Sequence, residues 1–472
     1  MSTLPELPKT VHAADSIADR EAGLNRQLSA RQLSMMALGA AIGTGLFLGS
    51  AVSVKAAGPG VILSYAAGAV IALFIAWALA EMAVAHPVAG SFGVYAETYV
   101  HPWAGFAVRY SYWLALTVAI GSDLVAASIY CRTWFPQVPG WVWVAAFALG
   151  LVYVNSRSVG NLGMFEYWFA MIKVATIVIF LFLGAALLSG MGFKPLGFAN
   201  YTAHGGFLPF GWKGVGLGIA MAIWSYIGTE TVAITSGEAR DPEKSVPRAL
   251  RSMVGRIAIF YIGGMAVLVG VMPWTEVGLS ESPFVRVFRS VGIPGAAGIM
   301  NFVVLTAALS SVNTNLYNCT RMLFSLSRGG YAPKLFGRLS QRGTPFAALV
   351  ASSAGMAIAL VLETYFKDSA YLQMLGVAFF GGLFAWVMIF VTHLLFRKKY
   401  KGELRVRAPW YPWTSLAGLA ALVVITISTW WVPGLRITLV SGLPWLVFIS
   451  VCYLVWAKAQ RSQGREKADS NG

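Results

Sequence analysis

Long apolar stretches recur along the whole chain and are separated by short segments rich in polar and basic residues. Each is close to the length that a helix needs to cross a bilayer, about 20 residues at a rise of 1.5 Å per residue. Strands of a membrane barrel would instead alternate apolar and polar residues over about ten positions. The pattern therefore predicts an all-α polytopic membrane protein with twelve transmembrane helices. The stretches lie near 32–54, 59–84, 105–130, 139–155, 164–190, 214–236, 256–272, 297–320, 344–363, 370–396, 414–431 and 437–457.

The composition supports a membrane protein. Of the 472 residues, 57% are hydrophobic and only 11% are charged, and the mean hydropathy of +0.67 lies far outside the range of soluble proteins. Cys131, Cys319 and Cys452 form no CxxC pair, and the five histidines are not spaced as metal ligands along one helix. We therefore expect no metal site, no catalytic residues and no cofactor.

The net charge of +16 could indicate nucleic-acid binding, but the distribution of basic residues along the chain favours a membrane topology instead. With the N-terminus in the cytoplasm, 26 of the 35 basic residues fall on the cytoplasmic side and eight outside, which follows the positive-inside rule. The polar segment 1–31 carries no cleavable signal pattern. We expect a multi-pass protein of a cell membrane, the bacterial cytoplasmic membrane, surrounded by lipid. The tails 1–31 and 459–472 would both be cytoplasmic.

The first and sixth stretches are each interrupted near the middle. Glycines at 39, 43, 45 and 49 interrupt the first, and the segment 224–230 weakens the sixth, because each glycine lowers helix propensity by ~1 kcal/mol. Paired interruptions in two halves of a chain point to a transporter with inverted repeats and a binding site at the breaks. Glycine also permits close helix packing, so both interpretations stay open for these residues.

Four ionisable residues inside the stretches carry candidate chemistry, because a charge in the membrane costs at least ~2.5 kcal/mol and usually faces a pathway or a partner. Lys173 is either a structural cation bound to carbonyls or a proton-titrating site. Glu230 either satisfies backbone N–H groups beside the break or contacts a substrate. Asp123 is a helix-packing or a substrate-binding residue, and Glu81 is an inner-gate or structural carboxylate.

A series of motifs runs through most of the chain in a fixed order. The motifs are RQLSMMALGAAIGTGLFLGS (31–50), AGP (57–59), AEM (80–82), HPVAGSF (86–92), FEYWF (165–169), IKV (172–174), SYIGTE (225–230), GEARDP (237–242), RML (321–323) and APK (332–334). Together they resemble an amino acid permease of the amino acid transporter family, within the amino acid, polyamine and organocation transporter superfamily. The resemblance rests on the order and spacing of the motifs, since each one alone is short.

The resemblance implies the fold of the bacterial leucine transporter, with helices 1 and 6 broken. Two inverted five-helix repeats would occupy 32–190 and 191–396, and 397–458 would add helices 11 and 12. It also implies import of an amino acid by alternating access, with the proton as coupling ion.

In such proteins the substrate lies between the two breaks. Its carboxylate would meet backbone N–H groups around Ile42, Gly43, Thr44 and Gly45. Its ammonium would meet carbonyls near Ser225, Ile227 and Gly228, with Trp224 as an aromatic gate or a packing residue. Lys173 would take the place of a sodium ion, bridging carbonyls around Gly39 and Ile42 with the hydroxyl of Ser310 or Ser311.

Three positions depart from the family pattern. Asp123 stands where many relatives have glutamate, Asn315 replaces a small residue, and Arg109 falls where relatives often have glycine. A neutral or aromatic amino acid is the expected substrate. An exchanger or polyamine carrier is the nearest alternative, and a non-translocating nutrient receptor is the alternative from another class. A membrane enzyme has no motif to support it, and the sequence does not indicate an oligomeric state.

Overall fold

The computed structural model describes residues 38, 41–88, 90–157, 162–191, 195–234, 242–290, 294–340, 344–366 and 369–469, without the side chains at 157, 162–166, 242 and 460–469. Over these ranges the chain is all-helical and contains no strand. Ten of the described helices are long and apolar enough to cross a membrane. The chain is thus a multi-pass membrane protein, as the hydrophobic pattern predicts.

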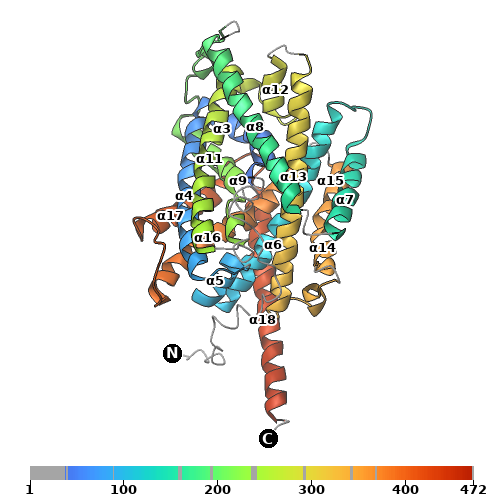
Figure 1. Ribbon diagram of the computed structural model, residues 1–472, viewed down its shortest axis with the longest axis vertical. Coiled ribbons are helices and arrows are strands. Elements are labelled where there is room, and N and C mark those ends of the chain that lie inside the picture. The colour runs from blue at the N-terminus through green and yellow to red at the C-terminus, as the bar shows by residue number, and fades with distance from the viewer. Residues whose placement is uncertain are drawn as a thin grey trace.

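The helices are packed side by side as an elongated bundle (Figure 1). Their bounds are η1 Gly45–Gly49, α3 Ser50–Ala57, α4 Val61–Ala85, α5 Ser91–Tyr99, α6 Pro102–Arg132, α7 Gly140–Arg157, α8 Leu162–Ser189, α9 Gly211–Tyr226, α10 Thr231–Ile234, α11 Pro242–Val271, α12 Pro283–Ser290, α13 Ala296–Arg328, α14 Phe346–Ser352, α15 Ala354–Tyr365, α16 Ala370–Lys399, α17 Trp413–Ser428 and α18 Ile437–Asp469.

The ten candidate spans do not map one to one onto the twelve predicted stretches. The first candidate, Gly45–Ala85, is 41 residues long and includes the end of the first stretch and all of the second. A tight turn at Gly58–Gly60 divides it, and Gly58 adopts a φ of +60°, which favours glycine. The apolar part of α7, Gly140–Ser156, is shorter than the ten candidates. Twelve crossings therefore stay a prediction.

Helix α6 lies at the centre of the bundle, where it packs against α13 and α16. Of its most apolar 18-residue window, 94% is buried, compared with 22% for α18. A helix enclosed in this way leaves no face for lipid. Its polar side chains, Asp123 among them, therefore face other helices of the protein.

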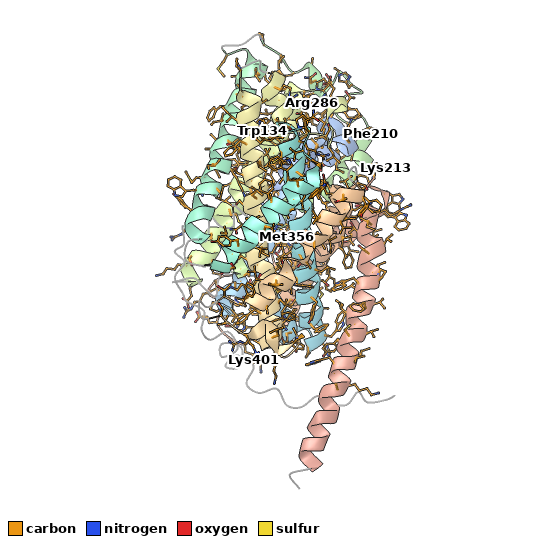
Figure 2. The ribbon with its side chains drawn as sticks, turned by 90° about the vertical axis from the view of Figure 1, so that its right-hand side faces the viewer. Trp134, Phe210, Lys213, Arg286, Met356 and Lys401 are labelled. Carbon is orange, nitrogen blue, oxygen red and sulfur yellow. The ribbon has the colours of Figure 1, made fainter. Side chains whose placement is uncertain are left out.

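The two ends of the bundle are distinct. Helix α12 lies at one end in Figure 1, whereas α5 and the projecting C-terminal part of α18 lie at the other. Figure 2 places Lys213 and Arg286 toward the α12 end and Lys401 at the opposite end. The sequence predicts the first two residues to be extracellular and the third to be cytoplasmic, and the arrangement agrees with that separation.

Two carboxylates near the α5 end bind arginines. Arg109, 2% exposed, forms an ion pair with Glu97 of α5, and its guanidinium carbon lies 5.1 Å from the centre of the Tyr331 ring. Glu81 pairs with Arg397 of α16 and accepts the backbone N–H of Ala408 at 2.6 Å. Buried charges require such partners. The Glu97 pair connects α5 to α6, and the Glu81 pair connects α4 to α16.

Candidate functional site

The first broken helix comprises residues 41–57. Its backbone bends at Ile42 and Gly43 before continuing through η1, a π-helical segment, into α3. The N–H groups of Leu46 and Phe47 both donate to the carbonyl of Gly43, at 3.3 and 3.4 Å. The predicted interruption of this helix is therefore present. Gly39 lies outside the described residues.

The second broken helix comprises α9, α10 and the residues between them. Helix α9 ends at Tyr226, Ile227 is extended with ψ at 134°, and α10 begins only at Thr231. Gly228 has a φ of +112°, a conformation that residues with a Cβ rarely adopt. The glycine thus permits the change of chain direction in the middle of this helix.

Glu230 holds the second break in place. Its Oε2 accepts the backbone N–H of Gly228 at 2.9 Å and the indole N–H of Trp386 at 3.0 Å. Its Oε1 accepts the hydroxyl of Tyr112 at 2.7 Å. The side chain is fully buried. This geometry matches the first of the two roles predicted for Glu230, the satisfaction of backbone N–H groups that a broken helix exposes.

A test follows from the three donors that surround Glu230. Glu230→Leu leaves all three unpaired, and each buried unsatisfied group costs about 1–3 kcal/mol. We expect a lower unfolding temperature in detergent, measured by intrinsic fluorescence. Glu230→Gln is the matched control, because its amide can still accept from Gly228 and donate to the Tyr112 oxygen. Normal folding but lost binding in Glu230→Gln would instead assign the carboxylate to the substrate.

One buried cavity of about 40 Å³ lies between the two breaks. Four segments of the fold form its wall, namely the two broken helices, α6 and α13. The lining residues are Ala41, Gly43, Thr44, Gly45, Leu116, Ala119, Asp123, Trp224, Ser225, Ile227, Gly228, Ser311 and Asn315. Of the predicted binding residues, only Ile42 and Glu230 are absent from the wall; both are fully buried.

Asp123 connects three elements at this cavity. Its Oδ1 accepts the hydroxyl of Thr44 in the first broken helix. Its Oδ2 accepts the hydroxyl of Ser311 at 2.7 Å and, more distantly, the amide of Asn315 at 3.4 Å, both from α13. A carboxylate buried at 3% exposure requires such donors. Asp123 therefore ties α6 to the first broken helix and to α13.

Lys173 on α8 is fully buried, and its charge acts on the carboxylate of Asp123. The resemblance predicted that Lys173 bridges to a hydroxyl of Ser310 or Ser311. Ser311 donates to Asp123, and because its oxygen can still accept, the bridge stays a prediction. Sequence reasoning selected both charged residues but did not pair them. Because Asp123 and Lys173 are 50 residues apart on different helices, no spacing rule could connect them.

Tyrosines from other helices cover the backbone oxygens of the breaks. The hydroxyl of Tyr261 on α11 lies 2.6 Å from the carbonyl oxygen of Ala41 and 3.0 Å from that of Ser225. The hydroxyl of Tyr371 on α16 lies 3.3 Å from the carbonyl oxygen of Thr44. Sequence reasoning missed both tyrosines, for which the only signal was a hydroxyl inside an apolar stretch.

Trp224 covers one side of the cavity. Its ring meets Phe379 of α16 edge to face, with centroids 5.8 Å apart. A β-carbon added at Gly45 would lie 2.9 Å from the Trp224 ring, so the indole lies directly against the first broken helix. This placement is compatible with either predicted role of Trp224, gate or packing.

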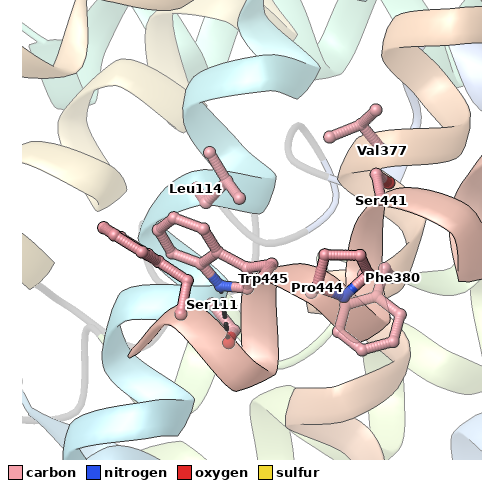
Figure 3. A pocket seen from close by; sticks show the side chains of 10 residues that line it. Ser111, Leu114, Val377, Phe380, Ser441, Pro444 and Trp445 are labelled. Carbon is pink, nitrogen blue, oxygen red and sulfur yellow. Dashed lines mark hydrogen bonds between the residues drawn. The ribbon is translucent and has the colours of Figure 1, made fainter. Parts of the chain in front are cut away.

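A second, larger cavity of about 350 Å³ lies between α6, α16 and α18 (Figure 3). Apolar side chains such as Leu114, Val377 and Phe380 line it, and the Trp445 indole donates to the hydroxyl of Ser111 at 3.1 Å. Its lining shares no residue with that of the cavity at the breaks. It also has no charged side chain, so the cavity at the breaks is the better candidate for a zwitterion.

Comparisons with known proteins identify the class. Residues 32–466 match the family described as amino acid permease. The uncharacterized amino acid permease YtnA of Bacillus subtilis is 38% identical over 437 residues, covering 91% of this chain and 94% of the relative. The gamma-aminobutyric acid permease of the same organism is 38% identical over 459 residues, covering 96% and 97%. The "probable threonine/serine transporter YbxG" is 36% identical over 448 residues, covering 93% and 96%.

A multi-pass helical protein with this family match is a membrane transporter, not an enzyme. The chain belongs to the amino acid permease family, and the resemblance in its motifs is confirmed.

Proposed function

We propose that this permease imports an amino acid together with a proton, by alternating access around the two broken helices. The observation that carries the proposal is that both breaks line one buried cavity. Discontinuous helices bind substrates in this way in many secondary transporters, because their ends present unpaired backbone groups at mid-membrane. The amino acid is the substrate expected from the family.

The polarity of the two helix ends suits a zwitterion. The N-terminal end of the outer half of the first broken helix, near Gly43 to Gly45, carries a partial positive charge that attracts a carboxylate. Carbonyls that lose their helical partners at the second break, around Ser225 and Ile227, attract an ammonium group. The Ser225 carbonyl also accepts from Tyr261 at 3.0 Å and has a second lone pair for the ligand. Both sets of residues line the cavity. We therefore assign the α-carboxylate to the first break and the α-ammonium to the second.

We further propose twelve transmembrane helices, with inverted repeats over 32–190 and 191–396 followed by helices 11 and 12 in 397–458. Support comes from the two broken helices, which would hold the first position of each repeat. The division of Gly45–Ala85 at Gly58–Gly60 and the shorter apolar helix α7 would supply the two crossings beyond the ten candidate spans.

Lys173 is proposed to carry the coupling proton. Lys173 and Asp123 are both buried, and the charge of the lysine acts on Asp123, which also holds Thr44 and Ser311. Loss of the lysine proton would leave a buried carboxylate without its counter-charge, at a cost of several kcal/mol. Protonation therefore favours this arrangement of helices, and deprotonation favours another, which is the differential stabilisation that coupling requires.

The proposed topology places both termini in the cytoplasm. Thr3→Cys and Ser470→Cys, made in a Cys452→Ala background to remove a partly exposed thiol, are expected to resist an impermeant maleimide in intact cells. They should react once the membrane is permeabilised. Labelling of both cysteines in intact cells would contradict this orientation.

Binding by the purified protein tests the function itself. The relatives are named for different substrates, so each common amino acid and several polyamines should be tried separately. A ligand that binds only the folded state raises the unfolding temperature, and we expect this from one or a few amino acids. A rise with polyamines alone, or with no compound at all, would contradict the proposal.

A further inference from the structure

We propose that Asn315 selects the substrate side chain, and that the permease prefers a small amino acid with a hydroxyl or amide side chain. This inference rests on the proposed function and extends it to the substrate class. It starts from the position of Asn315 on α13, four residues after Ser311, so that both side chains lie on the same face of the helix. Both line the cavity at the breaks.

The hydrogen bonds of Asn315 fix the orientation of its amide. Its Nδ2 lies 3.4 Å from Asp123 Oδ2 and 3.4 Å from Ser311 Oγ. Since a carboxylate only accepts, the nitrogen must be the atom that faces Asp123. The Oδ1 then points away from Asp123, and within the described part of the chain it has no hydrogen-bond partner.

Asp123 does not depend on Asn315. The carboxylate already accepts from Thr44 and from Ser311 at 2.7 Å, and it has the charge of Lys173 nearby. Both contacts of the Asn315 amide are at the long end of the hydrogen-bond range. The amide is therefore weakly engaged, on a side chain that lines the cavity, and its oxygen has no partner among the described residues. This suits a ligand donor better than a structural role.

The other side chains of the wall restrict the size of the substrate. Leu116, Ala119 and Ile227 offer no hydrogen bond, and Trp224 offers only its indole N–H, which donates and cannot accept. The polar side chains of the wall are already engaged: Thr44 and Ser311 donate to Asp123, and the Ser225 hydroxyl lies 3.1 Å from that of Tyr65. At about 40 Å³ the cavity is small for a ligand site, which favours a short side chain over an aromatic one. A serine, threonine or asparagine side chain would donate to Asn315 Oδ1. An alanine, valine or leucine side chain would leave that oxygen buried and unpaired.

Uptake into proteoliposomes tests the preference directly. Radiolabelled serine, threonine, asparagine, alanine, valine, leucine and phenylalanine are compared one at a time for the unaltered protein. Leaving a buried acceptor unpaired costs enough to change a rate or an affinity by about tenfold. We expect the three polar amino acids to exceed the apolar ones by about that factor, and phenylalanine to be among the poorest.

The readout for variants is the ratio of polar to apolar amino acid uptake. Asn315→Ala should reduce this ratio to near one, and Asn315→Ser should retain part of it. Asn318→Ala is the matched control, because Asn318 lies on the same helix, bonds to Thr231 and does not line the cavity. It should leave the ratio unchanged even if the overall rate falls. Because the readout is a ratio, partial misfolding of a variant does not imitate the effect.

Two results overturn the inference while leaving the proposed function intact. One is a preference of the unaltered protein for apolar or aromatic amino acids, and the other is a polar preference that Asn315→Ala and Asn315→Ser do not alter. Failure of the unaltered protein to transport any amino acid would reject the proposed function itself, and the inference with it.

Discussion

Proteoliposomes containing Lys173→Met are expected to lose accumulation of substrate against its gradient while still exchanging it downhill. The reason is that methionine cannot bind a proton, so position 173 has the same charge in every conformation. A pH difference of about one unit supplies about tenfold accumulation per proton in the unaltered protein, and in the variant the ratio should fall to about one.

Lys173→Arg separates a proton-carrying role from a purely structural one. Arginine keeps the positive charge near Asp123 but does not deprotonate in proteins. If Lys173 carries the proton, arginine therefore abolishes coupling. If Lys173 is only a structural cation, arginine can replace it. We expect loss of uphill uptake in this variant too. Lys213→Met, at an exposed lysine at the start of α9, should behave as the unaltered protein. Uphill uptake by Lys173→Met that an uncoupler abolishes would rule out Lys173 as the coupling site.

Gly43→Leu is expected to abolish substrate binding without preventing insertion in the membrane. A β-carbon at Gly43 would lie 3.1 Å from Ser311 Oγ, and the remaining side-chain atoms would enter a cavity of about 40 Å³. Overpacking typically costs about 1–3 kcal/mol, which converts to a loss of affinity of up to about 100-fold. Binding of radiolabelled substrate to the purified variant is the measurement.

Gly150→Leu supplies the matched control for that substitution. Gly150 lies on α7, and a β-carbon added there meets no atom within 4 Å. The same change in residue size should therefore leave binding unaltered. Unchanged affinity in a folded Gly43→Leu variant would place the substrate elsewhere.

The hydrophobic pattern predicted the fold class because lipid imposes a simple rule, in which every span must be apolar and helical. The two breaks could also be predicted, since glycine at 43 and 228 marks the positions where the backbone departs from a helix. The pattern also placed a boundary between the stretches 32–54 and 59–84, where the structure has the turn at Gly58–Gly60, while the number of crossings stays a prediction.

The partners of the site residues could not be predicted from the sequence. The Asp123 carboxylate bonds to Thr44 and Ser311, and feels the charge of Lys173, only because helices distant in sequence converge around it. Tyr261 reaches carbonyls of both breaks from α11, at 2.6 and 3.0 Å. Such contacts depend on how helices distant in the sequence pack together. Periodicity and spacing describe only local structure, so they do not reveal these contacts.

Proton-driven import is the central claim, and uptake by proteoliposomes under an imposed pH gradient tests it most directly. Each common amino acid is supplied outside at acidic pH to vesicles that are neutral inside and empty of substrate. We predict accumulation of at least one amino acid above its external concentration, and collapse of that accumulation when an uncoupler is added. Uptake that is indifferent to the gradient and occurs only into vesicles preloaded with amino acid would contradict the claim and identify an exchanger.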